Sequence, residues 1–266
     1  MITRRAVLAA AGLSLVGCAG KPASGATTIR YGDDESQIAE LHLPAGTAKV
    51  PAIVVIHGGF WLRDYGMALA SPLAGDLMRA GLAGYAIEYR RVGNGGGWPA
   101  TFDDVSAAID KLAEQPRIDL TKVVAVGHSA GGQLAVWAAG RRDTRVRLRG
   151  AVSQAGVLDL AKAYNEQLGG SAVQEFLGGT PQDQPERYAM ASPQARLPLR
   201  VPVALVHGNR DAVVPLSQSA GYLEAAKRAG DDVTLTTVPG AGHFDVIDPH
   251  HAAWTATRAE IDRLLR

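Results

Sequence analysis

The chain of 266 residues contains a single cysteine, Cys18, and this scarcity excludes two classes of site. A disulfide needs two thiols, so none can form within the chain, and a zinc site built on several cysteines is excluded as well. The chain also has almost no excess charge, because 27 Lys and Arg stand against 26 Asp and Glu, for a formal net charge of +1. The molecule therefore has no overall positive electrostatic field that would attract nucleic acid or acidic partners. We therefore expect no nucleic-acid partner.

The N-terminal region lacks an apolar run long enough to span a bilayer. Residues 1–5 are positively charged, and residues 6–17 form a run of small and apolar residues. A spanning helix needs about 20 residues, but a shorter run after a positive region is typical of a secretory signal peptide. We predict a signal peptide over residues 1–17.

The end of this run carries a second signal. Leu15-Val16-Gly17-Cys18 resembles the lipobox of bacterial lipoproteins, in which the cysteine is lipidated. We predict lipidation of Cys18, a tether over residues 18–27, and anchoring to a bacterial membrane. Thr3-Arg4-Arg5 is similar to a twin-arginine export signal, so the sequence leaves the export route open. The alternative is a cytoplasmic protein with a misassigned start codon.

Residues 28–266 alternate between strand and helix patterns without internal repeats, which is the pattern of one α/β domain. Strands bounded by helices predict a mainly parallel, twisted sheet that is covered on both faces. Residues 157–199 break the alternation, because they are rich in Gly, Pro, Gln and Tyr. We predict that they form a small cap insertion over the active site, with an ordinary helical excursion as the alternative.

The most informative motif is Gly127-His128-Ser129-Ala130-Gly131, which follows an apolar strand and precedes a helix of small residues. A Gly-x-Ser-x-Gly motif in this context predicts a nucleophile elbow, where a sharp turn exposes the serine hydroxyl. Side chains at Gly127 and Gly131 would collide with the neighbouring strand and helix. Ser129 is therefore the candidate nucleophile.

A nucleophilic serine needs a base and an acid, which follow it in the order acid, then histidine. His243 is the candidate base, because its glycine-rich turn directly follows a strand, whereas His250 and His251 begin the last helix. Asp211 is the candidate acid, because it follows the strand that ends at residue 207. Asp159 lies in the loop after an earlier strand and is the alternative.

The oxyanion donors should follow an early strand, and His57-Gly58-Gly59-Phe60-Trp61 occupies that position. Two successive glycines allow backbone N–H groups to approach a tetrahedral intermediate closely. We predict an oxyanion hole formed by Gly58, Gly59 and Ala130, with His57 in a structural role. Phe60, Trp61 and His128 are the candidates for contacting the substrate, although Trp61 could equally belong to the core.

Together these motifs resemble those of the α/β-hydrolase superfamily, within the esterase and lipase group that carries His-Gly-Gly. Residues 57–61 are similar to the H-G-G-x-W signature of arylformamidase-like hydrolases. Matches extend from about residue 28 to residue 266 and include Glu88-Tyr89-Arg90, Ser192-Pro193 and His207-Gly208. The resemblance implies an α/β-hydrolase fold and hydrolysis of a small ester or amide.

We predict a carboxylesterase that acts on small or medium acyl esters through a Ser-Asp-His triad. The alternatives are an arylformamidase-like amide hydrolase and a catalytically silent domain that only binds a ligand. The proposed chemistry requires no metal and no organic cofactor.

Overall fold

The computed structural model describes residues 25–266. The predicted signal peptide, Cys18 and most of the predicted tether lie outside these residues. Within residues 25–266, no helix combines the length and the apolar character that crossing a bilayer requires.

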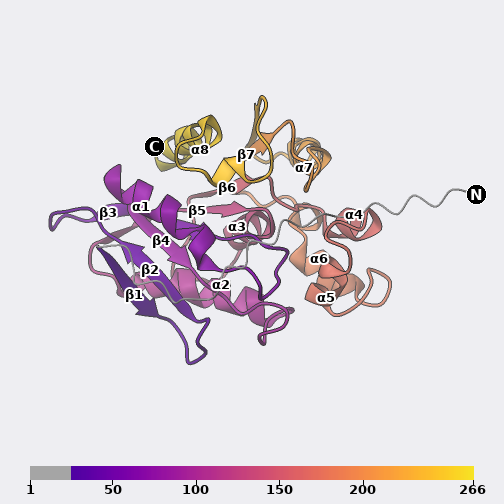
Figure 1. Cartoon of the computed structure of the whole chain (residues 1–266), viewed down its shortest axis with the longest axis horizontal. Helices are drawn as coiled ribbons and strands as arrows, with labels where there is room; N and C mark the ends of the chain where they lie inside the picture. The colour runs from indigo at the N-terminus through magenta and orange to yellow at the C-terminus, as the bar shows by residue number, and fades with distance from the viewer. Residues whose placement is uncertain (1–24) are drawn as a thin grey trace, which may run out of the picture.

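One sheet of eight strands forms the centre of the molecule, in the order β1-β2-β4-β3-β5-β6-β7-β8 (Figure 1). From β4 to β8 all neighbouring strands are parallel, whereas β2 is antiparallel to both β1 and β4. The carboxyl ends of the parallel strands therefore meet at one edge of the sheet. The strands are β1 (Ala26–Arg30), β2 (Ile38–His42), β3 (Val50–Ile56), β4 (Ala83–Ile87), β5 (Ile118–His128), β6 (Gly150–Gln154), β7 (Val203–Gly208) and β8 (Val233–Val238).

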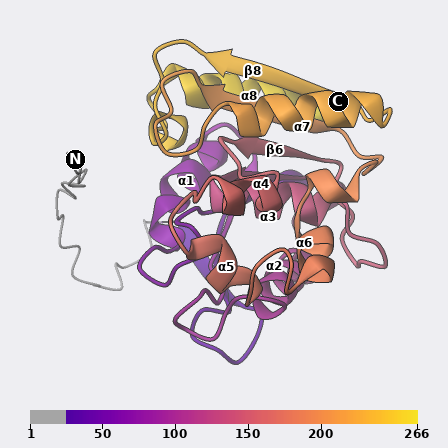
Figure 2. The same ribbon diagram turned by 90° about the vertical axis from the view of Figure 1, so that its right-hand side faces the viewer.

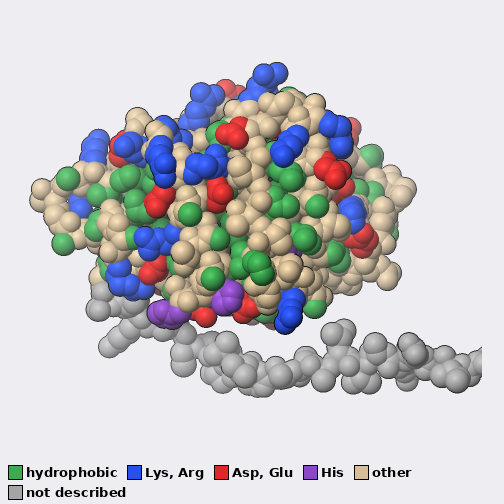
Figure 3. Space-filling view, turned by 90° about the horizontal axis from the view of Figure 1, so that it is seen from above, with side chains coloured by type: hydrophobic (Ala, Val, Ile, Leu, Met, Phe, Trp, Pro, Cys, Tyr) green, Lys and Arg blue, Asp and Glu red, His purple; other side chains and the backbone are tan. Residues whose placement is uncertain are grey.

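Helices cover both faces of this sheet. Buried residues of α1 and α8 pack against one face, and those of α2, α3 and α7 pack against the other. Figure 3, viewed from the side of α7 and α8, shows hydrophobic side chains scattered among charged ones. The helices are α1 (Ser71–Arg79), α2 (Ala100–Asp110), α3 (Ala130–Ala139), α4 (Leu160–Asn165), α5 (Ala172–Leu177), α6 (Pro185–Ala191), α7 (Ser217–Arg228) and α8 (Ala252–Leu265).

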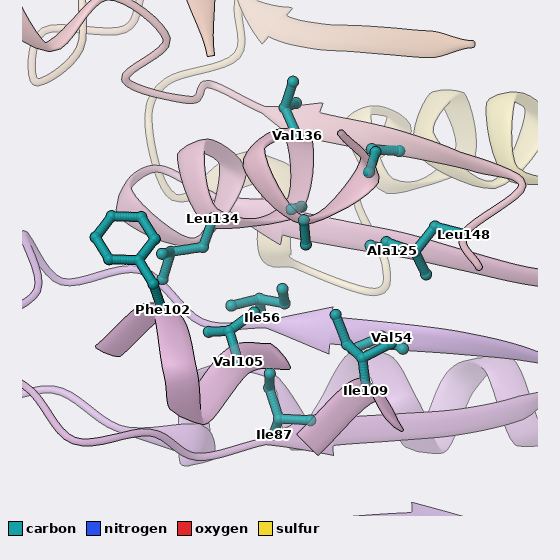
Figure 4. Packing of buried hydrophobic residues seen from close by; sticks show 14 of the residues in the cluster. Val54, Ile56, Ile87, Phe102, Val105, Ile109, Ala125, Leu134, Val136 and Leu148 are labelled. Carbon is teal, nitrogen blue, oxygen red and sulfur yellow. The ribbon is translucent and has the colours of Figure 1, made fainter. Parts of the chain in front are cut away.

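Strand β3, at the centre of the sheet, is apolar along its whole length because each face of the sheet carries its own core. In β3, Val54 and Ile56 face the core beneath α2 and α3, while Ile53 and Val55 face the core beneath α1 and α8. Alternate residues of a strand point to opposite faces, so a strand that is covered twice has no polar side. Figure 4 shows Val54 and Ile56 packed against side chains of α2 and α3, such as Val105.

The predicted fold class is confirmed, with two differences in its elements. Ala26 and Thr27 lie in the predicted tether but belong to β1 and pair with His42 and Leu41, because β2 extends far enough to meet them. Helix α7 was not predicted at all. Two of its four buried residues are the polar Gln218 and Ser219, so its sequence carries little apolar periodicity.

The segment over residues 157–199 contains the short helices α4, α5 and α6, which lie together at one end of the molecule (Figures 1 and 2). It packs on α3, since Gln133 Nε2 donates to the Ala191 carbonyl at 2.8 Å and Trp137 Nε1 donates to the Met190 carbonyl at 3.1 Å. The segment therefore follows β6 at the carboxyl edge of the sheet and continues over the helix that begins after Ser129.

Candidate active site

Ser129 lies at the turn between β5 and α3 in a backbone conformation that side chains rarely adopt. Its φ and ψ are 56° and −120°, and its N–H donates to the Gln154 carbonyl at 2.8 Å. A residue outside the common regions persists only where its surroundings hold it there, and such residues cluster at active sites. This geometry is the strained turn that the motif predicts.

The two flanking glycines are required by close backbone contacts. A Cβ added at Gly127 would lie 1.9 Å from the Gly131 carbonyl oxygen, and one added at Gly131 would lie 2.2 Å from that of Ile56. Real Cβ atoms do not approach backbone so closely, so any larger residue would displace α3 from β3 or β5. The glycines therefore allow the helix to start directly against the sheet.

Asp211 and His243 are brought together from two separate loops. His243 Nδ1 lies 2.7 Å from Asp211 Oδ2, and both side chains are almost fully buried. Because the carboxylate can only accept, Nδ1 carries the proton, and Nε2 is left free to take one. This is the arrangement in which a histidine acts as a general base.

The Asp211 carboxylate accepts four polar contacts. Oδ1 accepts from the N–H groups of Val213 and Val214, each at 2.8 Å, and His207 Nε2 lies 3.3 Å from Oδ2. Burial raises the pKa of Asp211, but the hydrogen bonds from His207, His243 and Val214 outweigh it and hold the pKa well below its usual range. The carboxylate is thus charged and fixed in orientation.

His207 is a site residue that sequence reasoning missed. Its Nε2 donates to the Val214 carbonyl at 2.9 Å, and its Nδ1 lies 2.8 Å from Ser219 Oγ. The ring therefore fixes the loop that carries Asp211. His207 precedes the candidate acid in the chain, which excluded it as the base. Its position four residues before Asp211 is the sequence feature that could have indicated a contact with that residue.

Both carboxylate oxygens of Asp159, the alternative acid, accept hydrogen bonds from residues other than His243. Oδ1 accepts from the Lys162 N–H at 3.0 Å as the N-cap of α4, and Oδ2 accepts from Gln194 Nε2 at 2.9 Å. The side chain of Asp159 therefore stabilises the 157–199 segment, and Asp211 alone is paired with His243.

His128 is buried next to the site, where its ring contacts the turn that carries His243. Its ring is buried, and its Nε2 lies 2.9 Å from the backbone carbonyl of His243. Burial, reinforced by the nearby His243, lowers the pKa of His128 to about 3. A neutral ring thus connects the residue before Ser129 to the candidate base, and its contact with substrate stays a prediction.

The predicted oxyanion loop lies against Ser129 with unpaired donors. A Cβ added at Gly58 would lie 3.0 Å from Ser129 Cβ, which shows how closely the loop approaches. Among residues 25–266, no acceptor takes the N–H of Gly58, Gly59, Phe60 or Ala130. His57 Nδ1 donates to the Gly58 carbonyl at 2.8 Å. In a trans peptide the N–H of the next residue points opposite to the carbonyl, so the Gly59 N–H points away from His57.

A buried charge network braces this loop from behind. Glu88 Oε1 contacts His57 Nε2 at 2.8 Å and also pairs with Arg91, while Oε2 accepts from the Met67 N–H at 2.8 Å. Burial raises the pKa of Glu88, but the charge and hydrogen bond of His57, with Arg91 and Met67, lower it overall. The His57 ring also stacks on Tyr89, 4.3 Å between centroids. His57 therefore has the structural role that the sequence predicts.

The two aromatic residues of the loop take different positions. Trp61 is fully buried, donates from Nε1 to Gln133 Oε1 at 3.0 Å, and stacks on Phe176 at 4.4 Å. Trp61 is therefore a core residue, which is the alternative to substrate contact that the sequence left open. Phe60 is only partly buried, and its ring meets the backbone of Gly169 from the 157–199 segment. Phe60 thus joins the oxyanion loop to that segment.

Two exposed aromatic side chains flank the site and were not predicted. Phe244 is 59% exposed, with its ring 5.3 Å from that of His243, and Tyr65 is 43% exposed and packs against Gly59. Large exposed aromatic rings beside a cleft often contact ligands. The position of Phe244 directly after the candidate base was its only signal in the sequence.

Metal chemistry was not predicted, and within residues 25–266 no cluster of three or more His, Cys, Asp or Glu side chains has an arrangement that could hold an ion.

Comparison with protein families identifies residues 77–262 as matching the prolyl oligopeptidase family, Peptidase_S9. The chain belongs to this family. Among curated relatives, esterase LipC of Mycobacterium tuberculosis is 27% identical over 258 residues, covering 86% of this chain and 62% of LipC. Dipeptidyl-peptidase 5 of Porphyromonas gingivalis is 24% identical over 226 residues, covering 77% of this chain and 32% of that protein. The chain thus spans about a third to two thirds of these relatives.

Solved structures support the same fold. A truncated form of a carbohydrate esterase from gut microbiota matches with a TM-score of 0.80 and 24% identity, covering 91% of this chain and 98% of that one. Esterase 2 of Thermogutta terrifontis, phosphonylated by sarin, matches with a TM-score of 0.74 and 22% identity, covering 91% and 94%. The chain therefore has an α/β-hydrolase fold and belongs to a family of hydrolases.

Proposed function

We propose that this protein is a serine carboxylesterase that acts on small or medium acyl esters. The observation that carries the proposal is the pairing of His243 Nδ1 with Asp211 Oδ2 at 2.7 Å, beside a serine at φ 56°. A base with one nitrogen fixed by a carboxylate and the other free is what serine acyl transfer requires.

In the proposed reaction, His243 Nε2 takes the proton of Ser129 Oγ as the oxygen attacks the ester carbonyl carbon. The unpaired N–H groups of Gly59 and Ala130 stabilise the resulting oxyanion. The carbon–oxygen bond to the alcohol then breaks, and the imidazolium returns its proton to the leaving oxygen. Water, deprotonated by the same imidazole, hydrolyses the acyl-enzyme and restores Ser129.

Three features favour an ester substrate. Esterase LipC is matched over 62% of its length, whereas dipeptidyl-peptidase 5 is matched over only 32%. Esters have better leaving groups than amides, so hydrolysis of an ester requires less catalysis from the same triad. The residue that favoured an aromatic formamide was Trp61, and its side chain is buried in the core. Formamide hydrolysis therefore stays a secondary activity in this proposal.

The acyl group would be held by the aromatic side chains around Ser129, namely Phe60, Tyr65 and Phe244. The 157–199 segment would act as the cap, since it contacts Phe60 through Gly169. We also retain the proposal that the protein is exported and anchored through a lipid on Cys18.

A fluorophosphonate probe tests the central claim. Wild-type protein should be labelled at a single serine, and Ser129→Ala should abolish labelling and lower ester turnover by on the order of a millionfold. Ser171→Ala is the matched control, because Ser171 is exposed and its hydroxyl contacts only Glu175. An unlabelled but folded wild-type protein would instead support a silent ligand-binding domain.

The substrate class is tested with p-nitrophenyl esters of rising chain length beside N-formylkynurenine. We expect the highest kcat/KM for a short or medium ester. If N-formylkynurenine exceeds every ester by more than about tenfold, which is ~1.4 kcal/mol of transition-state stabilisation, the formamidase alternative replaces this proposal.

A further inference from the structure

A cavity of about 900 Å³ opens at the edge of the sheet opposite Ser129. It is lined by the loop that leads from α3 into β6 and by the loop that leads into β7. Because β5, β6 and β7 run in parallel and end at the edge that carries Ser129 and Asp211, the residues just before β6 and β7 lie at the other edge. The cavity is therefore separate from the candidate active site.

The lining of this cavity is strongly positive. Six arginines line the cavity with a single carboxylate, Asp143, and Arg141 also pairs with Asp110 at 3.5 Å, so four positive charges are in excess in a chain whose net charge is only +1. Apolar side chains, including Leu148, Leu199 and Val201, complete its walls. The six arginines are Arg141, Arg142, Arg147, Arg149, Arg196 and Arg200.

Three of these arginines are fixed by backbone carbonyls. Arg196 donates to the Trp137 and Gly140 carbonyls at 2.7 and 2.8 Å, Arg149 donates to the Leu264 carbonyl at 2.7 Å, and Arg141 donates to the Ser106 carbonyl at 3.0 Å. Carbonyl groups orient a guanidinium without neutralising it, so most of the positive charge at Arg149 and Arg196 is left uncompensated.

The other three arginines are free within the described part of the chain. The side chains of Arg142, Arg147 and Arg200 form no hydrogen bond or ion pair with residues 25–266, although the Arg200 N–H is held by Asp231 at 2.9 Å. Burial lowers the pKa of Arg196, and the charge of Arg142 lowers it further. The guanidinium groups therefore repel one another, and an anion between them would relieve that repulsion.

We propose that this arginine-lined cavity, defined by Arg142, Arg147 and Arg200, binds the phosphate group of an organic phosphate. Guanidinium groups match phosphate oxygens in paired hydrogen bonds, and a phosphate monoester carries up to two negative charges, whereas a carboxylate carries one. The apolar walls suit the organic part of the ligand. A volume near 900 Å³ is in the range of small-molecule sites.

Nucleic acid is the less suitable ligand. A duplex presents phosphates along an extended line and is bound by a continuous basic stripe. Here the excess charge is confined to one cavity, and the chain as a whole is nearly neutral. The phosphate could belong to a soluble ester or to a lipid headgroup, since the recognition chemistry is the same.

The test uses full-length protein that carries Cys18→Ser, so that a lipid anchor does not contribute. Inorganic pyrophosphate is titrated by calorimetry, and sedimentation measures binding to phosphatidylcholine vesicles with and without phosphatidylglycerol. The double variant Arg142→Gln with Arg147→Gln should weaken binding at least about tenfold, because each removes a charged donor. Arg228→Gln is the matched control, because Arg228 is 72% exposed, pairs only with Glu224 and does not line the cavity.

Ester turnover should be unchanged in the double variant, which also reports that it is folded. Binding of pyrophosphate alone would identify a soluble phosphate ester, and binding of phosphatidylglycerol vesicles that pyrophosphate competes away would identify a headgroup. Either result supports the proposal when the double variant loses it. The proposal is overturned if neither probe binds, if the double variant binds as the control does, or if double-stranded DNA, titrated as a third ligand, is the only one that binds.

Discussion

The imidazole of His128 donates a hydrogen bond of 2.9 Å from Nε2 to the backbone carbonyl of His243. This contact joins the residue next to the candidate nucleophile to the candidate base, across 115 positions of the chain. The two rings lie 4.5 Å apart between centroids. Since Nε2 carries the proton, Nδ1 is unprotonated, and this buried atom has no partner among the described residues.

The first prediction concerns this contact. His128→Ala should release the turn that carries His243 and lower kcat by about 100-fold, because small misplacements of catalytic groups are costly. KM should change less than kcat, since the contact that is lost is one to the backbone of the candidate base. His128→Gln offers an amide N–H near the position of Nε2 and should recover part of the loss. Equal kcat values in wild type and His128→Ala would contradict a positioning role.

The pH dependence of stability follows from the same residue. The pKa of His128 is lowered to about 3 in the folded state, whereas an unfolded histidine titrates near 6.5. Between these values the unfolded chain binds the additional proton, so the free energy of unfolding falls as pH falls below about 6.5. The slope should approach ~1.4 kcal/mol per pH unit.

Urea unfolding between pH 7 and 5 measures this slope above the ordinary pKa range of carboxyl groups. His128→Gln should have a shallower slope over the same interval, because it removes one titrating group. An identical slope in both proteins would show that His128 does not govern this dependence.

The third prediction separates the two candidate acids. Asp211→Asn should lower kcat by about 10,000-fold, because His243 loses the carboxylate that sets its tautomer. Asp159→Asn is the matched control and should retain most activity, because its main contacts are the N-cap of α4 and Gln194. A larger loss of kcat in Asp159→Asn than in Asp211→Asn would reverse the assignment.

The fourth prediction tests the network behind the oxyanion loop. Glu88→Gln leaves Arg91 and His57 without their carboxylate and should lower the free energy of unfolding by about 3 kcal/mol. It should also lower kcat, because His57 no longer fixes the Gly58 carbonyl. Thermal unfolding and ester turnover measure the two effects. Glu114→Gln is the control, because its ion pairs with Lys111 and Arg145 are exposed, and it should behave as wild type.

The fifth prediction concerns export. In the native host, the protein should partition with membranes and incorporate labelled fatty acid, and Cys18→Ser should abolish the labelling. Intact mass spectrometry of the native protein gives an independent measurement. An unmodified chain that starts at Met1 would favour the cytoplasmic alternative.

The sequence alone determined the fold class and the strained turn at Ser129. The reason is that both depend on local patterns: apolar runs that can only be central strands, and glycines where backbones must touch. Gly127 and Gly131 are examples, since each prevents a collision with the next element. Chain order excluded four of the six other histidines as the base, and the predicted last helix excluded His250 and His251.

Only the tertiary structure decided which side chains meet. The sequence left Trp61 open between the pocket and the core, and the structure places it in the core, while the ring of His128 contacts the backbone of His243. His207 contacts Asp211, and arginines from two distant loops line one cavity. Such contacts depend on how strands are ordered in the sheet, and paired residues of neighbouring strands are separated by up to 71 positions of the chain, as Ala52 and Val123 are. Sequence periodicity reports the face of an element, but not the partner that covers it.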